Sequence, residues 1–203
     1  MNFLSPDSRF MQGWSNFVDA IIINLLMALT SIPIITIGAS LAAGQETTRR
    51  MLHAEGHWIR RYFKSFKQNF IKATMLWIVF GLVGALAAWM WLITIPELMV
   101  PKIALTLVWF IGFEWVWALQ ARFENPVSRT LINAYIFGVS YIWATLAMMA
   151  IDIAFVALIV ASFLYLPQGL FLLGVLGYGS LLSLHVPIQE YILRTHGHLP
   201  ATH

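Results

Sequence analysis

The sequence predicts an all-α protein, a polytopic bundle of transmembrane helices with about five spans. The first observation is composition: of 203 residues, 60% are hydrophobic and 10% are charged, whereas soluble domains carry roughly 25% charged residues. The second is the length of the apolar runs, which matches the hydrocarbon thickness of a bilayer. The third is the lack of the alternating apolar and polar segments that build membrane β-barrels. We therefore expect residues 1–203 to form a single integral membrane domain.

A basic stretch at residues 49–72 predicts the orientation of these spans. It holds seven of the 12 Lys and Arg residues and lies between apolar segments that are almost free of charge. Short segments rich in Lys and Arg resist translocation, so this stretch is expected on the cytoplasmic side. Residues 45–72 sum to +5 (seven bases minus Glu46 and Glu55), against +3 for the whole chain. The charge therefore indicates a juxtamembrane patch that faces anionic lipid headgroups, not a nucleic-acid interface.

The first predicted span covers residues 20–37 and is expected to kink or break near Pro33. Proline removes a backbone donor, so the carbonyls that it frees need other partners inside a membrane. Ser31 and Thr36 are placed to supply them, and Gly38 follows the break. A span that crosses fully gives an outer N-terminus, whereas a re-entrant turn at Pro33 gives an inner one. Both alternatives stay open at this point, with five crossings favoured.

The inner loop at residues 45–72 is predicted to contain a basic amphipathic helix. Within residues 58–72 the apolar side chains follow a period of 3.6, while basic and polar side chains mostly take the other faces. This pattern is typical of a helix that lies in the headgroup plane. It fits equally a helix that packs on the cytoplasmic ends of the spans, and the two interpretations can hold together.

Four further spans are predicted at residues 73–95, 103–120, 136–163 and 170–192. The short connection between the first two of these predicts an antiparallel hairpin. A second inner loop, residues 121–135, separates the two pairs. Alternation from the basic stretch then predicts a cytoplasmic C-terminus.

Three ionisable residues inside the spans form a candidate polar site: Asp152, Glu114 and His185. Asp152 lies near the middle of its span, where an ionised carboxylate costs at least about 2.5–3.5 kcal/mol, so it is expected to be protonated, paired or beside a polar cavity. Glu114 and His185 are predicted at a similar depth, where they can pair. Arg122 is a poorer partner for Glu114, since eight residues separate them by about 12 Å along a helix. Each group also has a structural interpretation, as a hydrogen bond between helices.

Charged and polar residues of the two inner loops form a candidate surface for lipid or for a partner protein. Pro126 is expected to break the helix at the residue before it, so its loop is either a docking surface or a well-capped turn. The candidate surface consists of Arg49, Arg50, Arg60, Arg61, Lys64, Lys67, Arg122, Glu124, Asn125 and Arg129.

The sequence contains no recognisable motif for catalysis or cofactor binding. It has no cysteine, which excludes disulfides, cysteine-based zinc sites and thiol catalysis. It has no Gly-rich phosphate loop, GxSxG motif or Walker lysine. His53 and His57 share a helical spacing, but Glu55 does not stand where zinc proteases have their glutamate. We predict no catalytic residue, no cofactor and no metal site, and therefore a protein that is not an enzyme.

Three short segments resemble the YesL-like family of bacterial membrane proteins, a family of unknown function. The first is Asn24 together with residues 32–38 (IPIITIG), the second is residues 62–70 (YFKSFKQNF), and the third is residues 122–126 (RFENP) with 133–134 (NA). The resemblance implies a five- or six-helix protein of the bacterial inner membrane. It also implies a link to carbohydrate use, since members often lie beside genes for carbohydrate uptake and breakdown.

Together these features favour a non-enzymatic accessory or partner-binding membrane protein linked to carbohydrate uptake or utilisation. The expected partners are anionic membrane lipids and components of a membrane transport system, without nucleic acid. The alternative is a small-solute or proton-coupled transporter that uses the candidate polar site. The sequence leaves the oligomeric state open.

Overall fold

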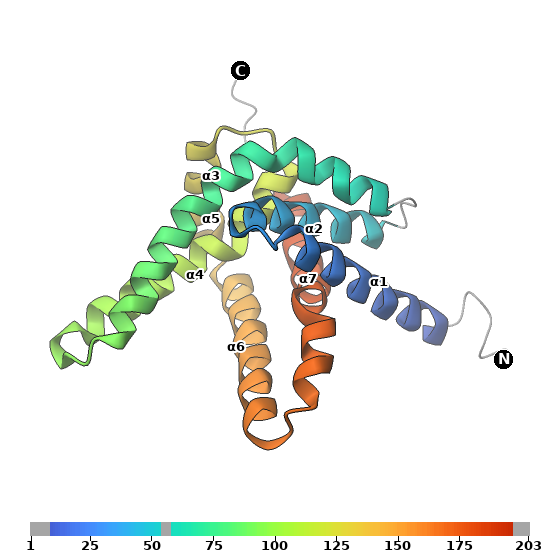
Figure 1. The fold of residues 1–203 in the computed structure, drawn as a ribbon. Helices are drawn as coiled ribbons and strands as arrows, with labels where there is room; N and C mark the ends of the chain where they lie inside the picture. The colour runs from blue at the N-terminus through green and yellow to red at the C-terminus, as the bar shows by residue number, and fades with distance from the viewer. Residues whose placement is uncertain (1–8, 54–57, 197–203) are drawn as a thin grey trace.

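The computed structural model describes residues 9–53 and 58–196, and all regular structure in that part of the chain is helical (Figure 1). The all-α class predicted from the sequence is therefore confirmed. The α-helices are α1 (Arg9–Thr30), α2 (Ile37–Leu52), α3 (Trp58–Leu92), α4 (Met99–Arg122), α5 (Val127–Ser140), α6 (Ile142–Tyr165) and α7 (Gly169–His196). Two short 3-10 helices, η1 (Ile34–Thr36) and η2 (Pro96–Leu98), lie in the connections.

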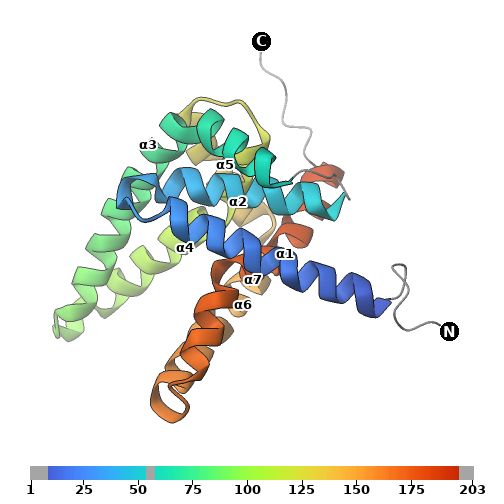
Figure 2. The same cartoon turned by 45° about the vertical axis from the view of Figure 1, so that its right-hand side comes forward.

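Two long helical hairpins extend from one end of the molecule and diverge from each other (Figures 1 and 2). One hairpin is α3–α4, closed by η2, and the other is α6–α7. Helices α2 and α5 and the ends of α3, α4 and α7 gather at the opposite end, which also carries the basic residues of the two predicted inner loops (Figure 1). We call this end of the molecule the basic end.

The surface of the two hairpins is strongly apolar. Four segments are long and apolar enough to cross a membrane: Trp58–Leu92, Pro96–Arg122, Ile142–Tyr165 and Gly169–Thr195. In α6 only 6% of the most apolar window is buried inside the protein. Exposed apolar areas of this extent are rare on water-soluble monomers, so these helices indicate a membrane protein.

The first predicted span, residues 20–37, is divided by a bend. Helix α1 ends at Thr30, and its apolar part, Phe17–Thr30, is shorter than the four long spans. It also falls short of the roughly 20 residues that a straight crossing needs. The hydroxyl of Thr36 donates to the carbonyls of Thr30 (2.5 Å) and Pro33 (2.7 Å), so two carbonyls at the bend have a partner. Four long spans and one shorter apolar helix thus stand where the sequence predicted about five spans, because Pro33 cannot continue the helix.

Helix α3 joins the basic amphipathic segment and the second predicted span into one continuous helix of 35 residues. Its first turns run along the top of the molecule, and the rest descends toward the tip of the hairpin (Figure 1). The apolar face of these first turns packs on α2 and α1: the buried Tyr62 places its hydroxyl 2.6 Å from Thr30 Oγ1 and 3.0 Å from Ser40 Oγ. Packing on other helices is therefore observed for part of this face, whereas Ile59, Phe63 and Phe70 on it are exposed.

Helix α2 approaches α3 very closely at Gly38. A Cβ atom added there would lie 2.2 Å from the carbonyl oxygen of Ala73 and 2.6 Å from Cβ of Trp77. Only glycine permits this distance, since the obstacle is the backbone of α3 and cannot rotate away. Gly38, which follows the bend at Pro33, is therefore a position of close packing between α2 and α3.

The fourth predicted span, residues 136–163, also differs in its first turns. Residues 136–140 end α5, the chain bends at Tyr141 (φ −113°, ψ 49°), and the long helix α6 starts only at Ile142. No proline or glycine stands at this bend, so no local signal marked it. By contrast, the helix break predicted at Pro126 is observed, with α5 beginning at Val127, although α4 already ends at Arg122 and not at the residue before the proline.

Helix α7 is interrupted inside its membrane-spanning part. Gly177 adopts φ 42° and ψ −146°, a conformation that residues with a side chain rarely take. The side-chain amide of Asn24, from α1, donates to the carbonyls of Gly174 (2.8 Å) and Val175 (2.9 Å). The backbone N–H of Gly179 donates in turn to Asn24 Oδ1 (3.4 Å). Asn24 therefore replaces hydrogen bonds that the interruption removes, as membrane helices require.

Candidate functional site

The three intramembrane candidates come together where α4, α6 and α7 meet. His185 Nδ1 lies 3.7 Å from Glu114 Oε2, and His185 Nε2 lies 3.5 Å from Asp152 Oδ1. One side-chain ligand atom from each residue lies within 4.8 Å of the other two. We call these three residues the acid–histidine cluster. The expected proximity of Glu114 and His185 holds in space, and Asp152 shares the same histidine.

The acid–histidine cluster is buried, and part of its hydrogen-bonding capacity is unused. Glu114 is 4% exposed and His185 is 1% exposed, whereas the Asp152 side chain is 18% exposed at the edge. Glu114 Oε1, Asp152 Oδ1 and His185 Nε2 have no hydrogen-bond partner within the described residues. Buried polar atoms are nearly always hydrogen-bonded, because leaving them unpaired costs free energy. Three such atoms in one place indicate a site suited to a further ligand.

Gln189 links this cluster to the basic end and was not a candidate from the sequence. It follows His185 by one turn of α7, and its Nε2 donates to the backbone carbonyl of Glu114 (2.6 Å). Its Oε1 is buried and has no partner among the residues described. The spacing from His185, four residues along one helix face, was the signal in the sequence that could have identified it.

A second site is a pocket of about 710 Å³ at the basic end, formed by α2, α3 and the end of α4. We call it the basic pocket. It brings together six of the ten residues of the candidate inner-face surface and adds Lys72, Gln120 and others. The pocket is lined by Glu46, Arg49, Arg50, Arg61, Lys64, Ser65, Gln68, Asn69, Lys72, Gln120, Ala121, Arg122, Phe123 and Glu124.

Internal contacts hold part of the basic pocket in place. Glu46 is buried and pairs with Arg49 (2.8 Å) and with Arg50. Gln120 Nε2 donates to Asn69 Oδ1 (3.0 Å), which ties α4 to α3. Lys64 and Lys72 have neither an ion pair nor a hydrogen bond within the described chain. Some of the positive charge is thus structural and some is available to a ligand.

The carboxylate of Glu190, on α7, organises the other side of the basic end. It accepts hydrogen bonds from Arg122 and from Arg194 (2.7 Å), and His53 Nε2 lies 3.4 Å from it. Glu190 therefore joins α7 to α4 and to α2, and it is the ionic partner of Arg122. His57 and Glu55, which entered the prediction on metal binding through their spacing to His53, lie outside the described residues.

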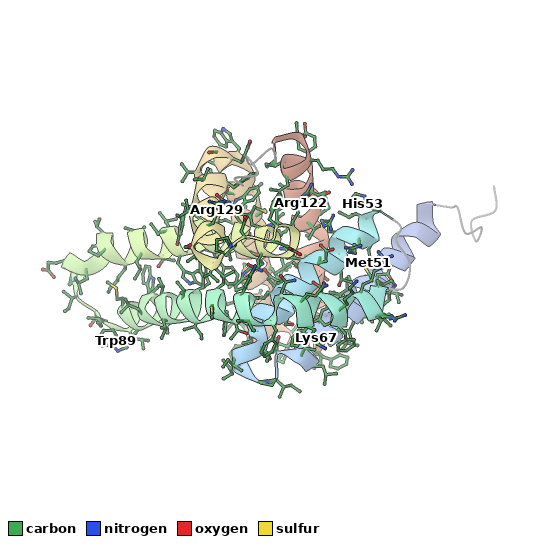
Figure 3. The ribbon with its side chains drawn as sticks, turned by 90° about the horizontal axis from the view of Figure 1, so that it is seen from above. Met51, His53, Lys67, Trp89, Arg122 and Arg129 are labelled. Carbon is green, nitrogen blue, oxygen red and sulfur yellow. The ribbon has the colours of Figure 1, made fainter. Side chains whose placement is uncertain are left out.

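The remaining candidates of the inner-face surface do not line the basic pocket. Arg60, Lys67 and Arg129 are exposed, and Asn125 is half-buried in the loop before α5. Viewed from above, Arg122 and His53 lie near the end of α7, and Lys67 lies on α3 (Figure 3). Trp89 lies well away from these residues, toward the tip of the α3–α4 hairpin (Figure 3).

Four spans with apolar surfaces, a basic pocket at one end and a buried polar cluster define a polytopic helical membrane protein. Residues 20–91 match the model of the family described as "Protein of unknown function, DUF624". YesL-like proteins are in this family, so the resemblance noted in the sequence is confirmed over that segment. Comparisons with curated proteins and with solved structures found no match.

Proposed function

We propose that this protein is a non-enzymatic accessory component of the bacterial inner membrane that binds a phosphorylated ligand in the basic pocket. The basic end faces the cytoplasm in this proposal, together with the C-terminus, in accord with the positive-inside rule. The observation that carries the proposal is the concave clustering of cations from three helices.

The charge of the basic pocket favours an anion. Six cationic side chains (Arg49, Arg50, Arg61, Lys64, Lys72, Arg122) and two carboxylates (Glu46, Glu124) line it, which leaves a net charge of +4. Guanidinium and ammonium groups bind phosphate through charge-assisted hydrogen bonds. A pocket of about 710 Å³ also falls in the range of small-molecule sites, about 300–1,000 Å³.

The other lining groups suit a ligand whose phosphate is attached to a moiety with several hydroxyl groups. Gln68, Asn69, Gln120 and Ser65 line the same pocket, and their amides and hydroxyl can both donate and accept hydrogen bonds. Gln120 Oε1 is buried and has no partner among the described residues. A sugar phosphate fits these groups, and the carbohydrate link implied by the YesL-like resemblance points to the same ligand class.

Replacing Lys64 and Lys72 together by Gln should weaken sugar-phosphate binding without disturbing the fold. Neither ammonium has a partner in the described chain, so their removal breaks no ion pair. A hydrogen bond to a charged group is worth about 1.5–3 kcal/mol, and we expect at least a tenfold rise in Kd. Calorimetry on the purified protein in neutral detergent, with glucose 6-phosphate as the probe, measures this change.

The matched control is Lys67→Gln, which removes an exposed lysine of α3 outside the pocket lining. It should leave the Kd unchanged. Inorganic phosphate should compete with the sugar phosphate, and glucose alone should bind far more weakly. Equal losses in the double variant and in Lys67→Gln would show that only the general charge of α3 matters, contrary to the proposal.

A second candidate function, a small-solute or proton-coupled carrier, is favoured by a different observation. Helix α7 is interrupted at Gly177, eight residues and about 12 Å from His185 in the acid–histidine cluster. Interrupted membrane helices beside buried ionisable groups are typical of transporter sites. In proteoliposomes, Asp152→Asn should abolish proton-coupled uptake, and unchanged uptake would exclude this role.

A further inference from the structure

We infer that the acid–histidine cluster binds a divalent transition-metal cation through Glu114, Asp152 and His185. This site is separate from the basic pocket, and the inference stands whether or not that pocket binds a phosphorylated ligand. It rests on three observations: the spacing of the ligand atoms, the uncompensated charge, and the buried atoms without partners.

The spacing of the ligand atoms suits a metal ion. Zinc binds histidine nitrogen at about 2.0–2.1 Å and carboxylate oxygen at about 2.0–2.2 Å in tetrahedral geometry, so its ligand atoms lie about 3.4 Å apart. The three ligand atoms of the cluster already lie within 4.8 Å of one another. Side-chain movements on the order of 1 Å close that difference. The two carboxyl groups lie beside different ring nitrogens of His185. Such a movement brings one carboxyl group toward the nitrogen that the other already faces, so that both can bind the same metal ion.

The charge of the cluster requires a cation or protons. Two carboxylates carry −2 when ionised, and among the ion pairs of the described residues none joins Glu114 or Asp152 to a lysine or an arginine. Keeping two bare carboxylates within membrane-spanning helices is costly. One divalent cation neutralises both, with neutral histidine as the third ligand.

Atoms of the cluster also have lone pairs that no regular hydrogen bond uses. Glu114 Oε1, Asp152 Oδ1 and His185 Nε2 form no regular hydrogen bond within the described chain, although His185 Nε2 and Asp152 Oδ1 lie 3.5 Å apart. Glu114 and His185 are more than nine-tenths buried, so bulk water does not reach their side chains. The lone pairs of such oxygen and nitrogen atoms are what a metal ion takes.

The ligand types select the class of metal. A set of one imidazole and two carboxylates suits Zn²⁺, Mn²⁺, Fe²⁺ or Co²⁺, whereas Mg²⁺ and Ca²⁺ prefer oxygen ligands only. Gln189 supports the geometry from the next turn of α7, since its amide holds the backbone of Glu114. Groups that orient metal ligands in this way contribute strongly to affinity.

The test is metal binding by the full-length protein, purified in detergent on a tag without histidine and stripped with a chelator. We expect one Zn²⁺ per chain by calorimetry and a raised Tm when Zn²⁺ is added. Loss of a supporting group costs 10–100-fold in affinity, so removal of a ligand in Glu114→Gln or Asp152→Asn should cost at least about 100-fold. Mg²⁺ and Ca²⁺ at the same concentration should not compete.

Two controls make the outcome decisive. Glu124→Gln removes a carboxylate at the basic end and should leave Zn²⁺ binding unchanged. Replacing His196, His198 and His203 by Ala removes the histidines of the C-terminal tail, another source of zinc binding, and should also leave it unchanged. Size-exclusion profiles confirm folding, and Glu114→Gln and Asp152→Asn provide two independent readings. Stoichiometric Zn²⁺ binding that persists in both, or no Zn²⁺ binding by the unaltered chain, would overturn the inference.

Discussion

Gly177→Ala is expected to be one of the most destabilising single substitutions in this protein. Gly177 has a positive φ of 42°, and a Cβ atom added there would lie 2.2 Å from Oδ1 of Asn24. The substitution therefore strains the backbone, at about 1–3 kcal/mol. It also displaces Asn24 from the carbonyls of Gly174 and Val175, and each buried group left unpaired adds about 1–3 kcal/mol.

The measurement for this prediction is unfolding of the purified protein in mixed micelles, followed by circular dichroism. We expect the free energy of unfolding to fall by about 3 kcal/mol or more, from the backbone strain and the lost hydrogen bonds together. Gly174→Ala is the matched control: it lies one turn away in the same helix, and a Cβ atom there meets nothing within 4 Å. If the two alanine variants unfold at the same denaturant concentration, the interruption of α7 at Gly177 is not rigid and the account of Asn24 fails.

The second large effect is expected for Glu190→Gln. Glu190 is buried and pairs with Arg122 and Arg194, with His53 at 3.4 Å. Breaking a buried ion pair from one side costs about 3–5 kcal/mol, because the remaining charge loses its compensation. Both arginines are partly exposed, so we expect the free energy of unfolding to fall by a smaller amount, about 2–3 kcal/mol. The same unfolding assay measures this change.

The control for Glu190 is Arg194→Gln on the same helix. The Arg194 side chain is 57% exposed, and exposed ion pairs contribute roughly 0–1 kcal/mol. Its removal should therefore cost much less than the removal of Glu190. Equal losses would indicate that Glu190 acts only through the local pair within α7 and not by joining α7 to α4 and α2.

Helix interruptions show how far local sequence signals reach. Pro33 and Pro126 each predict an interruption, because proline lacks the donor and clashes with the preceding turn wherever it stands in a helix. The bends at Tyr141 and Gly177 carry no such signal. Glycine at 177 permits the observed φ, but the hydrogen bonds that make it stable come from Asn24, 150 residues away in sequence from Gly174.

The acid–histidine cluster and the basic pocket could also be predicted only in part from the sequence. Apolar surroundings and the rise of 1.5 Å per residue were enough to place all three residues of the cluster inside spans, with Glu114 and His185 at comparable depth. They did not show that Asp152, predicted near the middle of its span, meets the same histidine. The sequence also marked the basic residues that belong at one end of the molecule. It did not show that Arg122 pairs with Glu190, that Lys72 joins a pocket with Arg49, or that Gln189 supports Glu114.

Composition and periodicity were therefore sufficient for the class of protein, its helical hairpins and the uneven distribution of its charge. These properties depend on transfer free energies and on helix geometry, which act on each segment separately. Which side chains meet, and the hollow between α2, α3 and α4, required the packed structure. Such contacts join residues far apart in the chain, and their geometry depends on how each helix is rotated and bent against its neighbours.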